Sequence, residues 1–325
     1  MFDIITIGDC TMDTIVTIDQ AEVKCDLKKT ECKLCFNYAD KIPIKHSKQS
    51  LGGNACNIAV SCSKLGLRSA IVSELGDDIN GYAIKNELEH KRVDTRFIKN
   101  IKNNETRYSV ILNYQAERTV LSYHADRKYN FPKINKTKWI YYTSLGKNFE
   151  KTQDKMMHYI FQNPETKLAI NPGSFQIKYA LKKIKSILQY CDILFVNKQE
   201  AQKIIGKKDN TKTLLEKLIK KGIKTVVITD GENGSFVADK DTDQKIKMKI
   251  YPGKKIAKTG AGDAYASGFV SAIIKEKDIK TAMMWGTANA NNVVRDFGAQ
   301  NGLANVRTIN KTIKANKHNT PKILT

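Results

Sequence analysis

The sequence predicts an α/β fold in which helices flank a doubly wound, mostly parallel sheet, and from which a small antiparallel β sheet projects. Three observations lead to this prediction. Short, wholly apolar runs suit parallel strands that are buried on both faces. Helical segments, several of which end at glycine, alternate with these runs along the chain. Other stretches alternate polar and apolar residues, as half-buried antiparallel strands do.

The strands of the main sheet are expected at apolar runs, of which residues 224–229 are typical. Helices are expected between them, where a glycine or a turn marks one end. The predicted strands are Phe2–Ile7, Ser69–Glu74, Trp139–Tyr142, Lys167–Ile170, Ile193–Val196 and Thr225–Thr229. The predicted helices are Asn54–Leu65 before Gly66, Asn80–His90, Thr211–Lys221 before Gly222, and a long helix from about Ala261 to Lys275.

The alternating stretches predict the small sheet, which we interpret as a candidate lid. They cover residues 11–19, 41–47 and roughly 106–123, and the last is expected to fold as a hairpin around Gln115-Ala116. The lid as a whole is predicted to comprise about residues 11–50 and 96–125 of a domain that spans residues 1–310. The basic, Asn-rich residues 311–325 are interpreted as a frayed C-terminal tail.

Length and composition limit the function classes. With 325 residues and 41% hydrophobic residues, the chain can bury a large core. No apolar run approaches the ~20 residues that a membrane span needs, and the first residues are typical of a strand rather than a signal peptide. The seven cysteines are an odd number. Reduced thiols and a cytoplasmic location are therefore expected.

The net charge of +22 is compatible with a nucleic-acid partner. The lysines, however, are spread along the whole chain, and no nucleic-acid-binding motif accompanies them. We therefore interpret them as surface residues and do not expect nucleic acid as a partner. Such a surface still attracts anionic ligands.

The strongest sign of catalysis is the segment Thr259-Gly260-Ala261-Gly262-Asp263, which leads into an apolar helix. Backbone N–H groups at a helix N-terminus form an anion site that the helix dipole strengthens. Asp263 then has two interpretations. It is either a plain helix cap, or a general base that removes a hydroxyl proton while the N–H groups hold the moving phosphoryl group. The loop alone does not distinguish them.

Three further segments suit ligand binding, but each is also consistent with an ordinary turn or cap. Gly52-Gly53 lets a ligand approach the backbone closely, and Asn57 offers a donor and an acceptor to a polyhydroxyl substrate. Asn197 and Glu200 share one helix face, either as a capping pair or as groups that steer a hydrated Mg²⁺. The segment Thr229–Gly234 closes a strand and either borders a nucleotide or forms a simple turn.

In this order and at these separations, the four segments resemble the ribokinase-type (PfkB) family of sugar and nucleoside kinases, over essentially the whole chain. The resemblance implies a ribokinase-like fold and ATP-dependent phosphorylation of a hydroxyl on a sugar or related polyol. It implies ATP and Mg²⁺ at the carboxyl edge of the sheet. A nucleoside kinase on the same fold is the alternative. A non-catalytic nucleic-acid-binding protein is a third class, against which the joint presence of Asp263, Asn197 and Glu200 argues.

The resemblance also implies roles for individual residues, and a homodimer formed through the lid. The base would be Asp263, and its anion hole would consist of Gly260, Ala261 and Gly262. Asn197 and, through water, Glu200 would organise Mg²⁺ and phosphate, while the ATP site would contain Thr229, Gly231 and Gly234, with Asn289 or Asn292 near the adenine. The substrate hydroxyls would be held by Asp13, Gly52, Gly53 and Asn57. Arg107 and Arg118 could meet a substrate phosphate, although alternate residues of their strands face solvent.

Two features depart from the family pattern. Members usually have Asp-Thr shortly before the Gly-Ala-Gly-Asp loop, where this chain has Ala257 and Lys258. Ala257 has no side-chain ligand for the monovalent cation that the Asp helps to bind, so we hypothesise that the Lys258 ammonium replaces K⁺.

The second departure is the stretch from Cys25 to Cys35 in the lid. Cys32 and Cys35, together with Cys25 and His46, could form a Cys₃His zinc site. Lid packing by reduced thiols is the favoured interpretation, because the spacing to His46 is loose and a second Cys-x-x-Cys is lacking.

Overall fold

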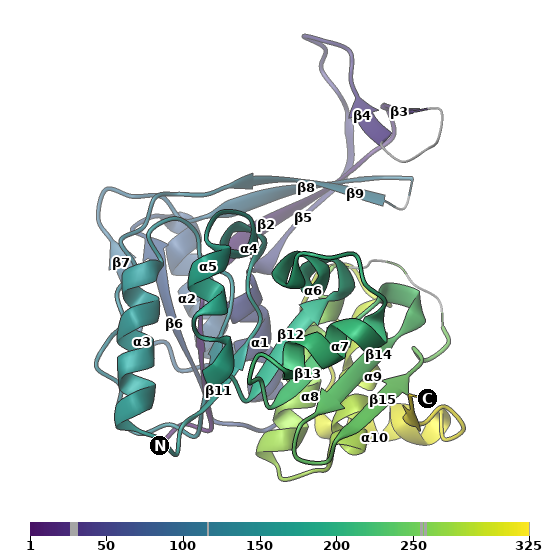
Figure 1. Ribbon diagram of the computed structural model, residues 1–325. Coiled ribbons are helices and arrows are strands. Elements are labelled where there is room, and N and C mark those ends of the chain that lie inside the picture. The colour runs from purple at the N-terminus through teal and green to yellow at the C-terminus, as the bar shows by residue number, and fades with distance from the viewer. Residues whose placement is uncertain (27–31, 116, 254–255, 257–258, 325) are drawn as a thin grey trace.

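The computed structural model describes residues 1–26, 32–115, 117–253, 256 and 259–324. Its largest element is a ten-stranded sheet with the order β16-β15-β14-β13-β12-β11-β10-β1-β6-β7 (Figure 1). Neighbouring strands from β7 to β13 are parallel, and those from β13 to β16 are antiparallel. The predicted mostly parallel sheet is confirmed. The strands are β1 Ile4–Ile7, β6 Ser69–Gly76, β7 Ile98–Ile101, β10 Trp139–Tyr142, β11 Lys167–Ile170, β12 Ile193–Asn197, β13 Thr225–Thr229, β14 Ser235–Asp239, β15 Gln244–Met248 and β16 Lys322–Ile323.

Helices cover both faces of this sheet, because alternate residues of each strand are buried in separate cores. Ile5 and Ile7 of β1 face one core, whereas Ile4 faces the other. The first face carries α3 Glu150–Gln162, α4 Ser174–Tyr179, α5 Leu181–Lys185, α6 Lys198–Ile205 and α7 Thr211–Ile219. The second carries α1 Asn54–Lys64, α2 Ile79–His90, α8 Ala261–Ile274, α9 Ile279–Val293 and α10 Val306–Ala315. Among the described helices, none is long and apolar enough to cross a membrane.

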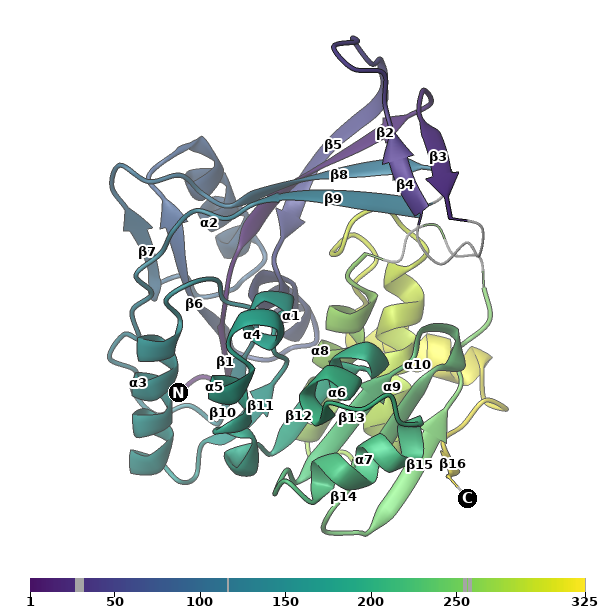
Figure 2. The ribbon, with the colours of Figure 1, turned by 45° about the horizontal axis from the view of Figure 1, so that its top comes forward.

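The small sheet lies above the carboxyl edge of the large one and is here called the lid sheet (Figure 2). Its order is β5-β2-β8-β9, with β2 Thr11–Ile18, β5 Ile44–Gly52, β8 Tyr108–Tyr114 and β9 Glu117–Tyr123. Its two outer pairs, β5–β2 and β8–β9, are antiparallel as predicted, whereas the central pair β2–β8 is parallel. The pairing of β8 with β9 confirms the predicted hairpin. Strand β7, which lies within the predicted lid range, pairs with β6 of the large sheet instead.

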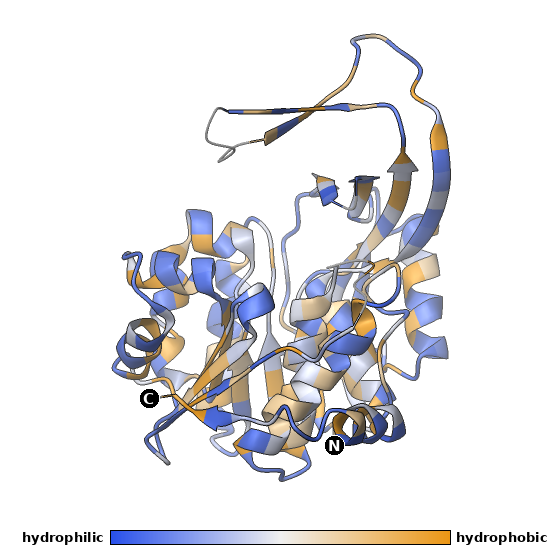
Figure 3. Ribbon diagram, turned by 90° about the vertical axis from the view of Figure 1, so that its right-hand side faces the viewer, coloured by the Kyte–Doolittle hydropathy of each residue, from blue (hydrophilic) through white to orange (hydrophobic). Residues whose placement is uncertain are grey.

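A two-stranded arm extends from the lid sheet and away from the body of the protein (Figure 3). It consists of β3 Glu22–Cys25 and β4 Cys32–Cys35. Cys25 lies opposite Cys32 in this pairing, and the two form a disulfide. The expectation of reduced thiols is therefore wrong for this pair. Within the described residues, no group of three or more His, Cys, Asp and Glu is arranged so that it could hold a metal ion.

Up to residue 324, the end of the chain contains a helix and a strand, contrary to the interpretation of residues 311–325 as a frayed tail. Helix α10 continues through residue 310 to Ala315, and Ile309 is fully buried. Strand β16 then pairs with β15 at the edge of the large sheet, with Ile323 opposite Ile246. Polar composition misled the sequence interpretation, because a two-residue edge strand requires only backbone hydrogen bonds.

Candidate active site

The Gly-Ala-Gly-Asp segment forms the first turn of α8, at the carboxyl edge of the sheet. Gly260 is the N-cap residue and has a φ of 76°, a conformation that favours glycine. A Cβ atom there would collide with Ala299, whereas the space around Gly262 is open. Ala261 and Gly262 line a cavity, so the first N–H groups of the helix lie where an anion could reach them.

Asp263 lies partly buried at this helix start. Asn57 Nδ2 donates a hydrogen bond to Asp263 Oδ2 at 2.8 Å. Burial raises the pKa of Asp263 to about 7; the Asn57 hydrogen bond opposes this rise, and the negative charge of Glu200 adds to it. A carboxylate with such a pKa can accept a proton near neutral pH.

The Asn57 amide is held in place by residues that the sequence analysis did not identify. Lys91 Nζ donates to Gln300 Oε1 at 3.0 Å, and Gln300 Nε2 donates to Asn57 Oδ1 at 3.0 Å. Because the Asn57 carbonyl accepts from Gln300, its Nδ2 is directed at Asp263. This row of hydrogen bonds, from Lys91 through Gln300 to Asn57, therefore fixes which oxygen of Asp263 the Asn57 amide contacts, namely Oδ2.

The glycine pair is packed against Asp13 of the lid sheet. Thr11 Oγ1 donates to Asp13 Oδ1 at 3.0 Å, and a Cβ atom on Gly52 would collide with the Asp13 carboxylate. Gly53 has a φ of 90°, and a Cβ atom there would collide with the Asp9 backbone. The structure thus places Asp13, Gly52, Gly53 and Asn57 around the junction of the lid sheet and α1.

Asn197 and Glu200 form a capping box at the start of α6. Glu200 N donates to Asn197 Oδ1 at 2.9 Å, and Asn197 N donates to Glu200 Oε2 at 2.8 Å. The capping interpretation is therefore confirmed. Burial raises the pKa of Glu200, whose charge also acts on Asp263, so the pair lies close enough to influence the base electrostatically.

A cavity of about 380 Å³ lies beside the start of α8. It contains the predicted Thr229, Gly231 and Gly234 together with Ala261 and Gly262. Four buried polar atoms of lining residues lack a hydrogen-bond partner within the described residues: Ser235 Oγ, Tyr251 OH, Tyr265 OH and Asn291 Oδ1. The full lining is Thr229, Gly231, Glu232, Gly234, Ser235, Ile250, Tyr251, Ala261, Gly262, Tyr265, Thr287, Ala290, Asn291 and Val294.

The asparagine that lines this cavity is Asn291, and not Asn289 or Asn292, which were predicted to lie near the adenine. Asn289 Nδ2 donates to Ala264 O at 2.8 Å and to Ser61 Oγ at 3.0 Å, which joins α9 to α8 and α1. Asn292 Nδ2 donates to Ala288 O at 2.8 Å and to Thr312 Oγ1 at 3.1 Å. Both side chains therefore hold helices together.

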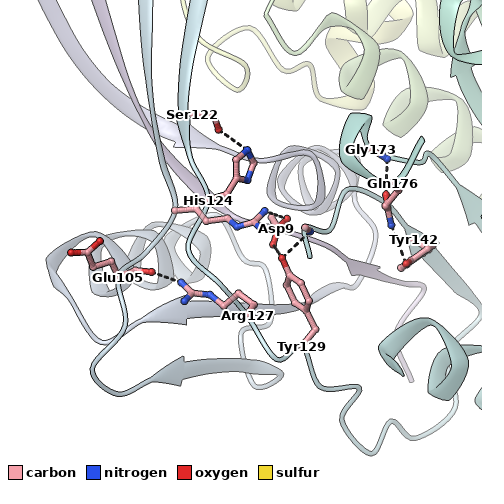
Figure 4. Close-up of polar contacts among 11 residues, drawn as sticks. Asp9, Glu105, Ser122, His124, Arg127, Tyr129, Tyr142, Gly173 and Gln176 are labelled. Atoms are coloured by element: carbon pink, nitrogen blue, oxygen red, sulfur yellow. Dashed lines mark hydrogen bonds and ion pairs between the residues drawn. The ribbon is translucent and has the colours of Figure 1, made fainter. Parts of the chain in front are cut away.

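A second buried carboxylate, Asp9, follows β1 at the root of the lid sheet (Figure 4). It forms an ion pair with Arg107, and both side chains are almost fully buried. Tyr129 OH donates to Asp9 Oδ1 at 2.8 Å and accepts from Gly146 N at 3.0 Å. Burial raises the pKa of Asp9 to about 6, against the opposing effects of Arg107 and Tyr129. Arg107 is thus committed to a carboxylate of the protein itself.

Arg118 has a different environment and lies near the start of β9. Its guanidinium Nη1 donates to Thr259 Oγ1, one residue before Gly260. Ala257 and Lys258, where the sequence departs from the family pattern, lie outside the described residues.

Comparison with known proteins places this geometry in context. A model of the pfkB family of carbohydrate kinases matches residues 12–305. An ATP-dependent 6-phosphofructokinase of Thermoanaerobacterium thermosaccharolyticum is 23% identical over 320 residues, which are 95% of this chain and 92% of that protein.

Two solved structures share the fold. A nucleoside kinase of Methanocaldococcus jannaschii, of the ribokinase family, superposes with a TM-score of 0.79 at 23% identity, covering 96% of this chain and 98% of that one. A putative ribokinase II from E. coli in complex with ATP and Mg²⁺ superposes with a TM-score of 0.79 at 15% identity, covering 97% and 100%.

Proposed function

Because this chain belongs to the pfkB family of carbohydrate kinases, we propose that it transfers the γ-phosphoryl group of ATP to a hydroxyl of a sugar or related polyol, with Asp263 as the general base. Family membership makes it an ATP-dependent phosphotransferase with an alcohol acceptor. The observation that carries the specific assignment is the placement of Asp263. Its carboxylate combines a pKa near neutrality with a position at an open helix N-terminus beside the cavity.

In the proposed reaction, Asp263 accepts the proton of the acceptor hydroxyl as its oxygen attacks the phosphorus atom. Asn57 holds the carboxylate in position through its hydrogen bond to Oδ2. The charge of Glu200 keeps Asp263 basic, because it disfavours a second negative charge nearby. The N–H groups of Ala261 and Gly262 stabilise the charge on the transferring phosphoryl oxygens.

The cavity fits the nucleotide. It opens beside Gly262. Its Asn291 Oδ1 and Tyr251 OH, which have no partner among the residues that the structure describes, offer an acceptor and a hydroxyl to a polar base. Thr229, Gly231 and Gly234 would border the phosphates and ribose. Mg²⁺, when bound, would neutralise phosphate charge, and Glu200 with Asn197 would hold its water ligands.

The acceptor is proposed to bind beneath the lid sheet, between the Asp13 and Asp263 carboxylates. A carboxylate that accepts hydrogen bonds suits hydroxyl groups, and the absence of a side chain on Gly52 and Gly53 leaves the backbone accessible. A nucleoside acceptor is the second candidate, supported by the structural similarity to the M. jannaschii nucleoside kinase over nearly the whole chain.

We further propose a homodimer through the lid sheet, in the cytoplasm. Tyr108, Leu121 and Tyr123 are exposed, and the β8–β9 register places them on one face of the sheet together with Val110. Such a patch favours contact with another apolar surface. Leu121→Glu should halve the mass measured by light scattering if the dimer forms there, whereas a monomeric wild type would contradict the proposal.

The function is tested by measuring ATP consumption with a panel of pentoses, hexoses, sugar phosphates and nucleosides. The Asp263→Asn variant is the matched control, since an amide cannot accept the proton while its shape is retained. One acceptor class should support turnover in the wild type and not in the variant. Equal turnover in both proteins would show that the base is elsewhere.

A further inference from the structure

A second cavity lies at the amino edge of the large sheet, on the side away from the lid sheet and the candidate active site (Figure 1). Four neighbouring parallel strands, β10, β1, β6 and β7, begin at this edge. The cavity measures about 580 Å³, a volume typical of small-molecule sites. Residues next to the starts of all four strands line it, namely Lys133 and Lys136 before β10, Phe2 before β1, Arg68 and Ser69 at β6, and Arg96 and Phe97 before β7.

Five cationic side chains line this amino-edge cavity, against one carboxylate, that of Asp94. The five come from three segments that are distant in the sequence, so the fold brings them together. They are Arg68, Arg92, Arg96, Lys133 and Lys136. A concave surface of one sign of charge concentrates ions of the opposite sign more strongly than scattered surface lysines do.

Two of the arginines are held in place and still have free donors. Arg96 Nε and Nη2 donate to Asp94 at 2.9 and 2.8 Å, and its guanidinium lies over the ring of Phe2, 5.4 Å from the centroid. Arg68 Nε and Nη2 donate to Asp3 at 3.3 and 3.4 Å. A guanidinium carries five N–H donors in a rigid plane. Three on each arginine are therefore not used by these carboxylates.

Two more cations and one hydroxyl at the cavity are without partners. Arg92 and Lys133 are exposed, and neither forms an ion pair within the part of the chain that the structure describes. Ser69 is 2% exposed, and its Oγ has no hydrogen-bond partner among the described residues. Buried hydroxyl groups nearly always have a partner. The Ser69 hydroxyl is thus available to an oxygen atom of a bound anion.

The local fold does not explain the arginine at position 92. Its φ is 59°, in the left-handed region, just after helix α2. Val93 N donates to Leu88 O at 3.0 Å, which closes the helix in the pattern that usually has glycine at this position. Glycine would suit the turn better than arginine, so we attribute the Arg92 side chain to a role in the cavity.

We propose that the amino-edge cavity binds the phosphate group of a small molecule, at a site separate from the candidate active site. Arg68 and Arg96 donate their free N–H groups to phosphate oxygens, Arg92 and Lys133 neutralise the charge, and Ser69 Oγ donates a further hydrogen bond. The ligand is held by charge and hydrogen bonds, and no covalent bond forms or breaks. The proposal goes beyond the kinase function and does not depend on it.

The test uses calorimetric titration of the full chain with two probes, inorganic pyrophosphate and glycerol 3-phosphate. Arg92→Gly removes a cation and suits the backbone at this position, and Ser69→Ala removes a hydroxyl that has no partner in the fold. Urea unfolding should show both variants to be at least as stable as the wild type. Lys212→Ala is the charge-matched control, because Lys212 is exposed on α7 and forms no ion pair among the described residues.

Wild type should bind at least one of the probes. Arg92→Gly should weaken this binding roughly tenfold or more, since it removes a charged hydrogen-bond donor, and Ser69→Ala should weaken it several-fold. Lys212→Ala should bind as the wild type does. Pyrophosphate that enters the cavity beside α8 gives the same heat in all four proteins. Tighter binding of glycerol 3-phosphate would identify a phosphate ester as the ligand, and tighter binding of pyrophosphate would identify an inorganic or diphosphate ligand; both support the site.

Three results would overturn the proposal. The first is no binding of either probe up to about 1 mM. The second is an Arg92→Gly variant that binds both probes as tightly as the wild type. The third is an equal loss in Lys212→Ala and Arg92→Gly, which would assign the binding to the overall charge of +22. The titrations require no turnover, so a failure of the proposed kinase function would leave their outcome unchanged and is distinguishable from a failure of this site.

Discussion

Asp9 and Asp263 are two buried carboxylates near the carboxyl edge of one sheet, and burial raises the pKa of both, to about 6 and about 7. Their partners differ. Asp9 is paired with Arg107 and accepts from Tyr129, whereas Asp263 accepts from the neutral Asn57 amide and is influenced by the negative Glu200. A carboxylate with a buried cation holds structure together, and one without it remains available to take a proton. The direction of the pKa shift therefore does not separate the two roles, whereas the partner does.

The largest expected effect is on turnover. Asp263→Asn should lower kcat by a factor on the order of 10³, because general-base catalysis typically contributes 10²–10⁴, while ATP affinity should change little. Steady-state kinetics and nucleotide binding measure the two quantities. If Asp9→Asn lowers kcat as strongly without unfolding the protein, the division between the two carboxylates is wrong.

The second effect is on stability. Asp9→Asn should destabilise the fold by about 3 kcal/mol, because it leaves the Arg107 charge buried without its counter-ion. Urea unfolding followed by circular dichroism gives this value. Asp19→Asn is the control, since Asp19 forms an exposed pair with Lys45 and its loss should cost at most about 1 kcal/mol. Equal losses in both variants would show that the Asp9 pair is not stabilising as argued.

A third effect also concerns stability, but here the substitution should stabilise the protein instead of destabilising it. The folded-state pKa of Asp263 lies above its unfolded value of about 4, so the folded state binds more protons between pH 4 and 7 and its stability falls as pH rises through this window. Asp263→Asn removes that loss and should stabilise the protein at pH 8 by up to about 4 kcal/mol, since each pKa unit of the difference contributes about 1.4 kcal/mol, with the gain vanishing toward pH 4. Urea unfolding at several pH values measures it, and a variant less stable than the wild type at pH 8 would contradict the assignment.

The smallest effect concerns Glu200. Turnover should fall about tenfold per pH unit below pH 7, as Asp263 becomes protonated. Glu200→Gln retains a capping-box residue but removes the negative charge, so the midpoint of this acidic limb should move down by roughly half a pH unit. The pH profile of kcat/KM reports this shift separately from any change in the plateau. An unmoved midpoint would show that Glu200 does not tune the base.

Most of the large sheet could be predicted because its buried strands are continuous apolar runs. Trp139–Tyr142, Lys167–Ile170 and Thr225–Thr229 have the bounds expected from the sequence. Strands β14 to β16 were not predicted, since they add to one edge with mixed polarity. The Cys25–Cys32 disulfide depends on the strand pairing of the arm, which composition does not indicate.

The loop around Asp263 was predictable from local sequence, but its supports were not. Asn291, and not its neighbours Asn289 and Asn292, lines the cavity. Helix α9 is buried on most sides, so periodicity alone could not assign one face to the ligand. The ion pair of Asp9 with Arg107 joins residues 98 positions apart. Charged residues are usually exposed, and nothing in the local sequence marks these two as an exception.

Strand β16 has a consequence for how the protein behaves at high concentration. Ile323 and Lys322 cover part of β15, and Leu324 N donates to Lys245 O at 2.7 Å. Without them, the backbone of β15 would present an open row of hydrogen-bonding groups to other molecules. The last residues that the structure describes thus cover the edge of the sheet and oppose edge-to-edge aggregation. A version shortened at residue 320 should therefore be less soluble, although it retains its catalytic groups.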